Sequence, residues 1–367
     1  MSFDRNIPYN DLPNLPPKKD IESKNILRKA ICASRALAEL KQAGELIPNQ
    51  AVLINTIPLL EAKLSSEIEN IVTTTDELFQ YAGNENNARN PMTKETLRYR
   101  RALYEGFTYL KKKPLCAATA IKVCQIIRNI DIGVRSTLGT KIANKETGTV
   151  IYTPPEGIDV INNKLSNWEH FLNNTSDIDP LIRLAIMHYQ FEAIHPFSDG
   201  NGRTGRILNI LYLIQEELLE IPVLYLSRYI LQTKSEYYTR LRGVTENEEW
   251  EEWIIYMLDA IQCTAEWTSS KIRAIRNLLQ HTCDYVKEKS PAIYSHELVE
   301  LVFTQPYSRI FNLTDANIAK RQTASNYLKN LCKIGVLREI KLGREKIFIH
   351  PKLMNLLKSD RNEFDHY

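Results

Sequence analysis

The sequence contains few cysteines, few glycines, no long apolar run and almost no net charge. Its six cysteines are scattered without a C-x-x-C pair, which argues against a disulfide framework or a zinc site and predicts small buried side chains in a reducing compartment. The 47 Lys and Arg nearly balance the 44 Asp and Glu, and 43% of the residues are hydrophobic, which excludes a disordered tail protein and a general nucleic-acid coat. No run approaches the roughly 20 apolar residues of a membrane helix, and the segment Met1–Pro8 lacks a signal-peptide pattern. We therefore expect a cytoplasmic protein without membrane contact.

The low glycine content and the spacing of apolar residues predict an all-α fold. Thirteen glycines in 367 residues are about half the usual share of roughly 7%, and long stretches place Leu, Ile and Ala three and four residues apart. The expected helices run from about 26 to near Gly44, from 50 to 64, from 163 to 174, and from 180 to 193 with Asp179 as N-cap. The Pro-rich residues 1–20 are expected to lie as an extended arm over a surface.

One internal segment departs from the helical pattern. Residues Lys141–Thr153 place β-branched side chains on both sides of a polar turn that contains glycine, and two prolines follow. This pattern predicts a short β-hairpin, whose second strand includes Val150, Ile151 and Tyr152. The free edge of such a hairpin could pair with another protein chain.

The last 90 or so residues predict a C-terminal winged helix-turn-helix. Two helices are expected over 314–321 and 322–331, followed by strands over 336–340 and 346–349 with Gly343 at the turn between them. Eight basic residues and only two acidic ones lie between Lys320 and His350. This excess would suit contact with DNA phosphates, but it would also suit a module that docks onto protein or forms a homodimer, and both interpretations stay open.

One glycine-rich segment carries the clearest chemical signal. The segment reads His195-Pro196-Phe197-Ser198-Asp199-Gly200-Asn201-Gly202-Arg203-Thr204-Gly205-Arg206 and directly precedes an apolar helical pattern. Backbone amides at the start of a helix bind anions, and Arg203 and Arg206 in the first turn would bind phosphate. Asp199 offers an oxygen ligand for Mg²⁺, and His195 offers a base that titrates near neutral pH. Together these residues predict a site for nucleophilic attack on a nucleotide phosphate.

Other interpretations of the same glycines were weighed. Gly200, Gly202 and Gly205 satisfy the G-x-G-x-x-G fingerprint of dinucleotide-binding proteins, but that fingerprint requires a preceding strand, and here a helix is predicted. The chain has no G-x-x-x-x-G-K-S/T motif of P-loop proteins. A surface loop between two helices, with solvated arginines, is the remaining structural alternative.

The segment matches the signature H-x-F-x-D/E-G-N-G-R-x-x-R of the Fic (filamentation induced by cAMP) family at every fixed position, and the chain resembles that family over about residues 60–265. The resemblance implies a Fic-type helical core in which the hairpin at Val150–Tyr152 is a flap that docks the target. It also implies a protein adenylyltransferase, which transfers AMP from ATP, with Mg²⁺, to a Tyr, Thr or Ser hydroxyl of a target protein and releases pyrophosphate.

The resemblance also implies a role for each residue of the motif. His195 would deprotonate the attacking hydroxyl, and Asp199 would hold Mg²⁺ at the phosphates. ATP would be bound by the anion hole, the two arginines and the residues between them: Gly200, Asn201, Gly202, Arg203, Thr204, Gly205 and Arg206. Tyr237 and Tyr238 are candidates for contact with the adenosine, although ordinary packing of these tyrosines is an equal alternative. Phe197 is expected to be a buried core residue.

A second motif lies upstream of the first. Ser65, Glu69 and Asn70 match the pattern S/T-x-x-x-E-G/N of the family's inhibitory helix, although Ser66 and Glu69 alone would also form a capping box that begins a helix. The resemblance implies that Glu69 pairs with Arg206 in place of the γ-phosphate, so that the chain inhibits itself. Modification of the protein by itself is expected, and removal of AMP by the same site stays open.

Three functions and three domains follow from this sequence. The leading function is an auto-inhibited protein adenylyltransferase; the alternatives are the same fold with another donor or in AMP removal, and a nucleotide-sensing regulator that binds DNA. The expected domains are an N-terminal region over 1–85, a Fic core over 86–270 and a winged-helix domain over 271–367.

Overall fold

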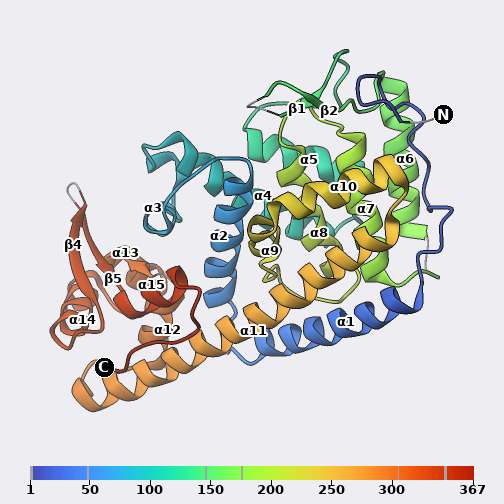
Figure 1. Ribbon diagram of the computed structural model, residues 1–367. Helices are drawn as coiled ribbons and strands as arrows, with labels where there is room; N and C mark the ends of the chain where they lie inside the picture. Colours follow the sequence, from blue (N-terminus) through green and yellow to red (C-terminus); the bar gives the residue numbers. More distant parts are fainter. Residues whose placement is uncertain (1–2, 48, 145–146, 175–176, 305, 343–344) are drawn as a thin grey trace.

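The computed structural model describes residues 3–47, 49–144, 147–174, 177–304, 306–342 and 345–367, and most of them lie in α-helices (Figure 1). The all-α prediction is therefore confirmed. The helices before the hairpin are α1 (Lys24–Glu45), α2 (Ala51–Ile68), α3 (Thr75–Tyr81), the short 3₁₀ helix η1 (Glu85–Asn87), α4 (Pro91–Leu110) and α5 (Ala117–Arg128). Those after it are α6 (Ile158–Asn174), α7 (Pro180–Ile194), α8 (Asn201–Gln215), α9 (Leu226–Gln232), α10 (Lys234–Asn247) and α11 (Trp250–Lys289).

Two central helices form the middle of the core. In α7 every residue except Pro180 and Glu192 is buried, and α8 is buried along most of its length. Helices with apolar residues on all sides are buried on all sides, and α7 and α8 pack against each other with α4, α5 and α6 around them. Asp179 caps α7 by accepting hydrogen bonds from the amides of Leu181 and Ile182, which confirms the predicted N-cap.

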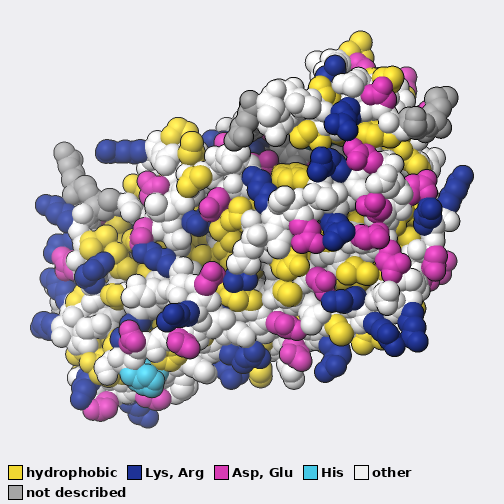
Figure 2. Space-filling model, in the orientation of Figure 1, with side chains coloured by type: hydrophobic (Ala, Val, Ile, Leu, Met, Phe, Trp, Pro, Cys, Tyr) yellow, Lys and Arg dark blue, Asp and Glu magenta, His cyan; other side chains and the backbone are white. Residues whose placement is uncertain are grey.

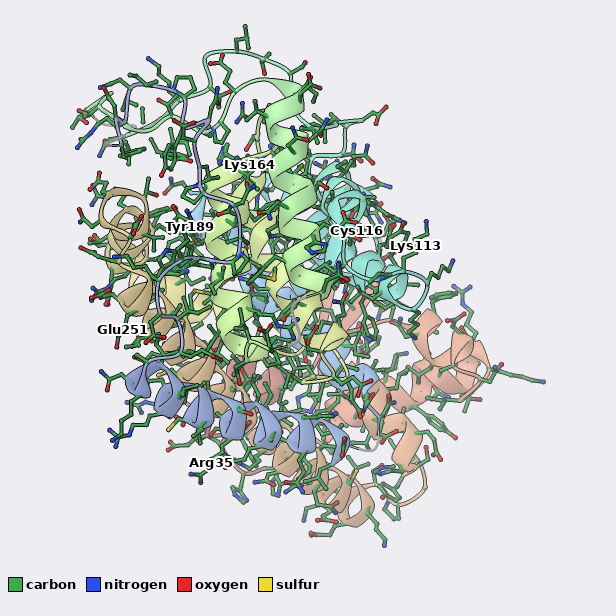
Figure 3. All side chains as sticks on the ribbon, turned by 90° about the vertical axis from the view of Figure 1, so that its right-hand side faces the viewer. Arg35, Lys113, Cys116, Lys164, Tyr189 and Glu251 are labelled. Atoms are coloured by element: carbon green, nitrogen blue, oxygen red, sulfur yellow. The ribbon has the colours of Figure 1, made fainter. Side chains whose placement is uncertain are left out.

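The N-terminal segment crosses the outside of α6 and α7, as the arm prediction requires. Lys164 of α6 donates to the carbonyl of Leu12, and Gln190 of α7 donates to that of Pro13 at 2.9 Å. Figure 3 shows this side of the molecule with Lys164 and Tyr189 labelled. Leu12 and Leu15 are buried, so the arm contributes to the core as well as covering it.

The longest helix joins the core to the C-terminal elements. Helix α11 has 40 residues, and α1 packs along its first part (Figure 1). The predicted boundary between residues 270 and 271 falls inside this continuous helix, and the division into three domains stays a prediction. Among the described residues no helix is long and apolar enough to cross a membrane.

The predicted hairpin is present beside the N-terminal arm. Strand β1 (Ile142–Ala143) pairs antiparallel with β2 (Val150–Tyr152). The Tyr152 hydroxyl donates to the carbonyl of Ala193 at 2.8 Å and so fixes β2 to the end of α7. Lys145 and Glu146, in the predicted turn, lie outside the described residues.

The C-terminal region contains more elements than the sequence predicted. They are α12 (His296–Thr304), β3 (Tyr307–Ser308), α13 (Ile310–Asp315), α14 (Arg321–Lys333), β4 (Arg338–Leu342), β5 (Glu345–Ile349) and α15 (Pro351–Lys358), with the sheet order β3-β5-β4. The prediction of a helix over 314–321 is wrong, because Asn317 adopts a left-handed φ of 55° and ends that helix, leaving 316–320 as the turn. Gly343 and Arg344 lie outside the described residues, and the winged-helix assignment stays a prediction.

Three smaller expectations also need correction. Gly44 lies inside α1, which ends one residue later, and α2 extends past Leu64 to Ile68. The six cysteines are not all buried, because Cys32 and Cys263 are exposed. No disulfide forms, since all six thiols are free.

Candidate functional site

A tight loop between α7 and α8 carries the motif. His195 ends α7 with a left-handed φ of 49°, and Gly200 precedes α8 with a φ of 87°, which favours glycine at that position. The Asn201 side chain holds the loop closed, since it accepts from the amide of Phe197 and donates to its carbonyl, both at 2.8 Å. Phe197 is buried as expected. A helix precedes the glycines. Because the dinucleotide-binding fingerprint requires a preceding strand, that interpretation is wrong here.

His195 is held in a defined orientation at the end of α7. Its ring forms a hydrogen bond to the carbonyl of Glu192, which leaves the other ring nitrogen free to accept a proton. Arg135 donates to the His195 carbonyl at 2.8 Å. Burial, together with the charge of Arg135, lowers the pKa of His195 to about 4. The expectation that His195 titrates near neutral pH is therefore wrong, because burial disfavours the charged ring. The imidazole is neutral at physiological pH, which is the form a general base requires.

Arg206 and Glu69 form a close ion pair across the helices α8 and α2. Their Nη2 and Oε1 atoms are 2.8 Å apart, and the Arg206 side chain is only 1% exposed. Arg206 also donates to the hydroxyl and the carbonyl of Ser65, at 2.8 and 3.0 Å. Burial alone would raise the pKa of Glu69, but the charge and hydrogen bond of Arg206 outweigh it and lower that pKa.

The upstream motif ends a helix and does not begin one. Glu69 is the C-cap residue of α2, and Asn70 follows with a left-handed φ of 63°, a conformation that Asn often adopts after a helix. The capping-box alternative for Ser66 and Glu69 is therefore wrong. Lys234, at the start of α10, donates to the carbonyl of Ile68 at 2.6 Å and binds the end of α2 in this place.

Arg203 and Asp199 lie in a second cluster of charges. Arg203 pairs with Glu95 of α4 at 2.7 Å and is 2% exposed. Arg128 of α5 joins the two groups, because it lies 3.2 Å from Glu95 and 2.8 Å from Asp199. The structure thus separates the two arginines of the motif, with Arg206 facing Glu69 and Arg203 facing Glu95.

Asp199 is the residue that fits a magnesium ion. Its carboxylate is 59% exposed, and Mg²⁺ is usually bound by one or two carboxylates together with phosphate oxygens and water. No cluster of three or more His, Cys, Asp or Glu that could hold a metal occurs in the part of the chain that the structure describes. A metal at Asp199 would therefore depend on the phosphates of a bound nucleotide.

A cavity of about 540 Å³ brings the two motifs and the hairpin together. Its lining includes the following predicted site residues: Glu69, Ile151, Tyr152, His195, Gly202, Arg206, Tyr237 and Tyr238. The two tyrosines differ, because the Tyr237 hydroxyl is hydrogen-bonded to His188 at 2.9 Å in the core, whereas Tyr238 is 42% exposed. Packing therefore accounts for Tyr237, and Tyr238 is open to a ligand.

The remaining predicted residues are not part of the lining of this cavity. They are Ser65, Asn70, Val150, Asp199, Gly200, Asn201, Arg203, Thr204 and Gly205. Sequence reasoning missed Glu95, Arg128 and Lys234, which come from other helices and carry no local signal. It also missed Glu192, although a lone acidic residue in the apolar helix α7 is a usable signal.

Three family models match successive parts of the chain. The Fic/DOC family N-terminal model matches residues 27–108, the Fic/DOC family model matches 118–213, and the model of the protein adenylyltransferase SoFic-like C-terminal domain matches 278–353. The chain belongs to the Fic/DOC family. Its helical core and the H-P-F-S-D-G-N-G-R motif are thus those of a Fic domain.

Relatives of this Fic chain carry adenylyltransferase names. A probable protein adenylyltransferase of Aquifex aeolicus is 29% identical over 174 residues, which are 46% of this chain and 52% of that protein. The protein adenylyltransferase fic-1 of Caenorhabditis elegans is 40% identical over 70 residues, 18% of this chain and 12% of that one. The chain thus spans about half the length of the first relative and less of the second.

Solved structures show the same fold. A Fic family protein from Desulfovibrio desulfuricans superposes with a TM-score of 0.56 at 17% identity, covering 91% of this chain and 98% of that one. Fic-1 of C. elegans superposes with a TM-score of 0.50 at 18% identity, covering 67% of this chain and 74% of that one. The likeness to the first structure extends over nearly the whole chain.

Proposed function

We propose that this Fic protein is an auto-inhibited protein adenylyltransferase, which transfers AMP from ATP to a Tyr, Thr or Ser hydroxyl of a protein. The observation that carries the proposal is the meeting of His195, Arg206 and Glu69 in one cavity at the start of α8. The adenylyltransferase names of the relatives from A. aeolicus and C. elegans support the same reaction.

The proposed reaction uses few protein groups. The neutral His195 imidazole takes the proton of the acceptor hydroxyl, whose oxygen then attacks the α-phosphorus of ATP. The bond from the α-phosphorus to the bridging oxygen breaks, and pyrophosphate leaves. The backbone amides from Gly200 to Gly202 at the N-terminal end of α8 would stabilise the charge on the phosphate oxygens. Mg²⁺ held by Asp199 would supply further neutralisation of that charge.

The proposed inhibition follows from the partner of Arg206. A guanidinium bound to Glu69 and Ser65 is not available to the γ-phosphate of ATP. A carboxylate at this position would also repel the phosphate. ATP would therefore bind in a position from which the α-phosphorus is not aligned with the attacking hydroxyl.

The hairpin is the proposed place of target binding. Strand β2 lines the cavity through Ile151 and Tyr152, beside His195. An extended segment of a target that paired with this strand would bring its hydroxyl close to the base. Because such pairing uses mainly backbone groups, we propose no particular target.

The charged C-terminal face favours a second partner, DNA. Arg321, Gln322, Asn326 and Lys329 of α14 are exposed, and Figure 2 shows Lys and Arg side chains gathered over α14 and β4. A surface of this kind suits a phosphate backbone. A gel-shift assay with DNA would test this proposal. Binding to DNA that falls steeply with salt would support it, whereas no binding at low salt would contradict it and favour a protein-docking module.

The main experiment measures transfer directly. Wild type, Glu69→Gly and His195→Ala are incubated with Mg²⁺ and ATP labelled at the α-phosphate, and self-modification is followed by gel and intact mass. We expect an added AMP mass on Glu69→Gly, weak label on wild type, and a loss of about 10²- to 10⁴-fold in His195→Ala. Parallel reactions with γ-labelled ATP and α-labelled UTP test the other donors. Absence of label from ATP in every variant would contradict the proposed function.

A further inference from the structure

The cavity contains a second carboxyl group, to which the proposed reaction assigns no role. Glu192 lies on α7, one turn before His195, and lines the same cavity as Glu69 and Arg206. Its Oε1 atom is buried and has no hydrogen-bond partner among the residues that the structure describes. A buried polar atom without a partner is rare in proteins and commonly marks a place where a ligand or water binds.

The backbone of α8 is shaped around this carboxyl group. A Cβ atom on Gly205 would lie 2.5 Å from Glu192 Oε1 and 3.3 Å from the ring of Phe191. Any other residue at position 205 would displace the Glu192 side chain. Close contact with Glu192 therefore explains why position 205 is a glycine, independently of any anion binding by the amides at the start of α8.

Charged and titratable groups from three other elements lie near Glu192. Arg206 of α8 and Glu69 at the end of α2 influence its pKa. The charge of Glu192 in turn raises the pKa of Tyr237 and Tyr238 of α10. Burial raises the pKa of Glu192 itself to about 7, with Arg206 opposing and Glu69 adding to the shift. The carboxyl group can therefore accept or donate a hydrogen bond at neutral pH.

We propose that Glu192 is a specificity-determining residue, which binds the nucleoside part of the nucleotide through a ribose hydroxyl or the amino group of the base. This inference rests on the proposed function. A phosphate is the wrong ligand, because Arg206 and the amides of α8 already provide for it and a carboxylate would repel it. A nucleoside is uncharged and offers hydroxyl and amino donors, and Tyr238 beside Glu192 presents an exposed ring to a base.

The test measures nucleotide binding rather than transfer. The parent protein carries Glu69→Gly, to free Arg206, and His195→Ala, to prevent turnover. Dissociation constants are measured by calorimetry for ATP, 2′-deoxy-ATP, 3′-deoxy-ATP and inosine triphosphate, which lacks the amino group of adenine. The same set is measured after Glu192→Gln, and after Glu246→Gln as the control.

Glu246 is a suitable control because its carboxyl group lines the same cavity but is 36% exposed and faces Arg5. We expect the parent to bind ATP at least about tenfold more tightly than one of the three analogues, and Glu192→Gln to abolish that ratio. Glu246→Gln should preserve it. The analogue that is rejected identifies the group: a deoxy nucleotide identifies the hydroxyl, and inosine triphosphate the amino group.

Two results would overturn the inference while leaving the proposed function intact. One is a ratio of affinities for ATP and the rejected analogue that Glu192→Gln does not change. The other is an equal loss of affinity for all four nucleotides in Glu192→Gln, which a purely structural role of Glu192 would give. A parent protein that binds no nucleotide would contradict the proposed function itself. Thermal unfolding of each variant checks the fold, and Glu192→Ala replaces the glutamine variant if that variant does not fold.

Discussion

The ammonium group of Lys234 donates a hydrogen bond to the backbone carbonyl of Ile68 at 2.6 Å, and so joins the first turn of α10 to the last residue of α2. The carbonyl groups at the end of a helix lack partners within the helix, and a cation there is favourable. The residue after Ile68 is Glu69, which pairs with Arg206. A contact from outside α2 thus reaches the end of the helix that carries the proposed inhibitory carboxylate.

Replacing this lysine should weaken the proposed inhibition. Lys234→Met keeps the length of the side chain but removes the charged hydrogen bond, which contributes about 1.5–3 kcal/mol in such settings. We expect self-modification with α-labelled ATP to rise roughly tenfold over wild type, and less than in Glu69→Gly. In the Glu69→Gly protein, Lys234→Met should not raise self-modification further, because the Glu69 carboxylate that the lysine would help to position is already absent.

A matched control is available on another helix. Lys41 also donates to a backbone carbonyl, that of Glu217, at 3.0 Å, away from the end of α2. Lys41→Met should leave the rate of self-modification unchanged. Equal rates in wild type and Lys234→Met would show that this hydrogen bond does not position Glu69.

Arg128 should compete with magnesium for Asp199. Its guanidinium lies 2.8 Å from the Asp199 carboxylate, at the place where a cation on that carboxylate would bind. Arg128→Gln removes a positive charge there, so the half-saturating Mg²⁺ concentration for transfer should fall roughly two- to fivefold, as for other exposed ion pairs. Magnesium titrations of the Glu69→Gly protein with and without the change provide the measurement. Arg101→Gln, which removes an ion pair with Glu85, is the control, and an unchanged or higher Mg²⁺ requirement in Arg128→Gln would count against a metal at Asp199.

The buried His350 should make the C-terminal elements less stable in acid. Burial lowers the pKa of His350 to about 3, whereas in an unfolded chain the value is about 6.5. Below pH 6.5 the unfolded chain therefore binds a proton that the folded protein does not, and stability falls as the pH falls. The loss for this residue is about 1.4 kcal/mol between pH 7.5 and 5.5.

His350→Asn separates this effect from the loss of packing. The ring nitrogen of His350 accepts from the amide of Leu353 and caps α15, a role that Asn also performs. Urea unfolding at several pH values should give a smaller loss of stability in acid for His350→Asn than for wild type, by about 1.4 kcal/mol at pH 5.5. His170→Asn, at an exposed position, should follow wild type; an identical pH dependence in all three proteins would refute the assignment.

Local patterns predicted the parts of the fold and site that depend on neighbours in sequence. Asp179 before Pro180 predicted the start of α7, and the contiguous motif from His195 to Arg206 predicted the loop and helix that form the site. The partners of Arg203 and Asp199 could not be predicted in this way. Glu95 and Arg203 are 108 residues apart, and only the packing of α4, α5 and α8 brings them together with Arg128.

The role of a glycine also cannot be predicted from its neighbours in sequence alone, because it depends on the residues that pack around it. The sequence indicated that Gly44 ends a helix, yet the helix continues past it to Glu45. The conformation of glycine allows it to end a helix but does not require this. Whether the position tolerates a side chain depends on the residues of α2 and the loop before α9 that pack against it.

Two glycines inside helices should respond to alanine in opposite directions. A Cβ on Gly44 would meet Ile221 and Leu53 at 4.0 Å, which is ordinary contact, whereas a Cβ on Gly106 of α4 would lie 2.6 Å from Leu211 Cδ1. Alanine stabilises a helix interior by about 0.5–1 kcal/mol relative to glycine. We expect this gain for Gly44→Ala in urea unfolding.

For Gly106→Ala the same gain is opposed by overpacking, which typically costs about 1–3 kcal/mol, so we expect a net loss of about 1 kcal/mol. Leu211 is fully buried in α8, so its side chain would have to move within the core to make room. Leu211→Val in the Gly106→Ala protein shortens the side chain that collides and should recover part of the loss. A stabilised Gly106→Ala protein would contradict this prediction, because it would show that the end of the Leu211 side chain shifts at little cost.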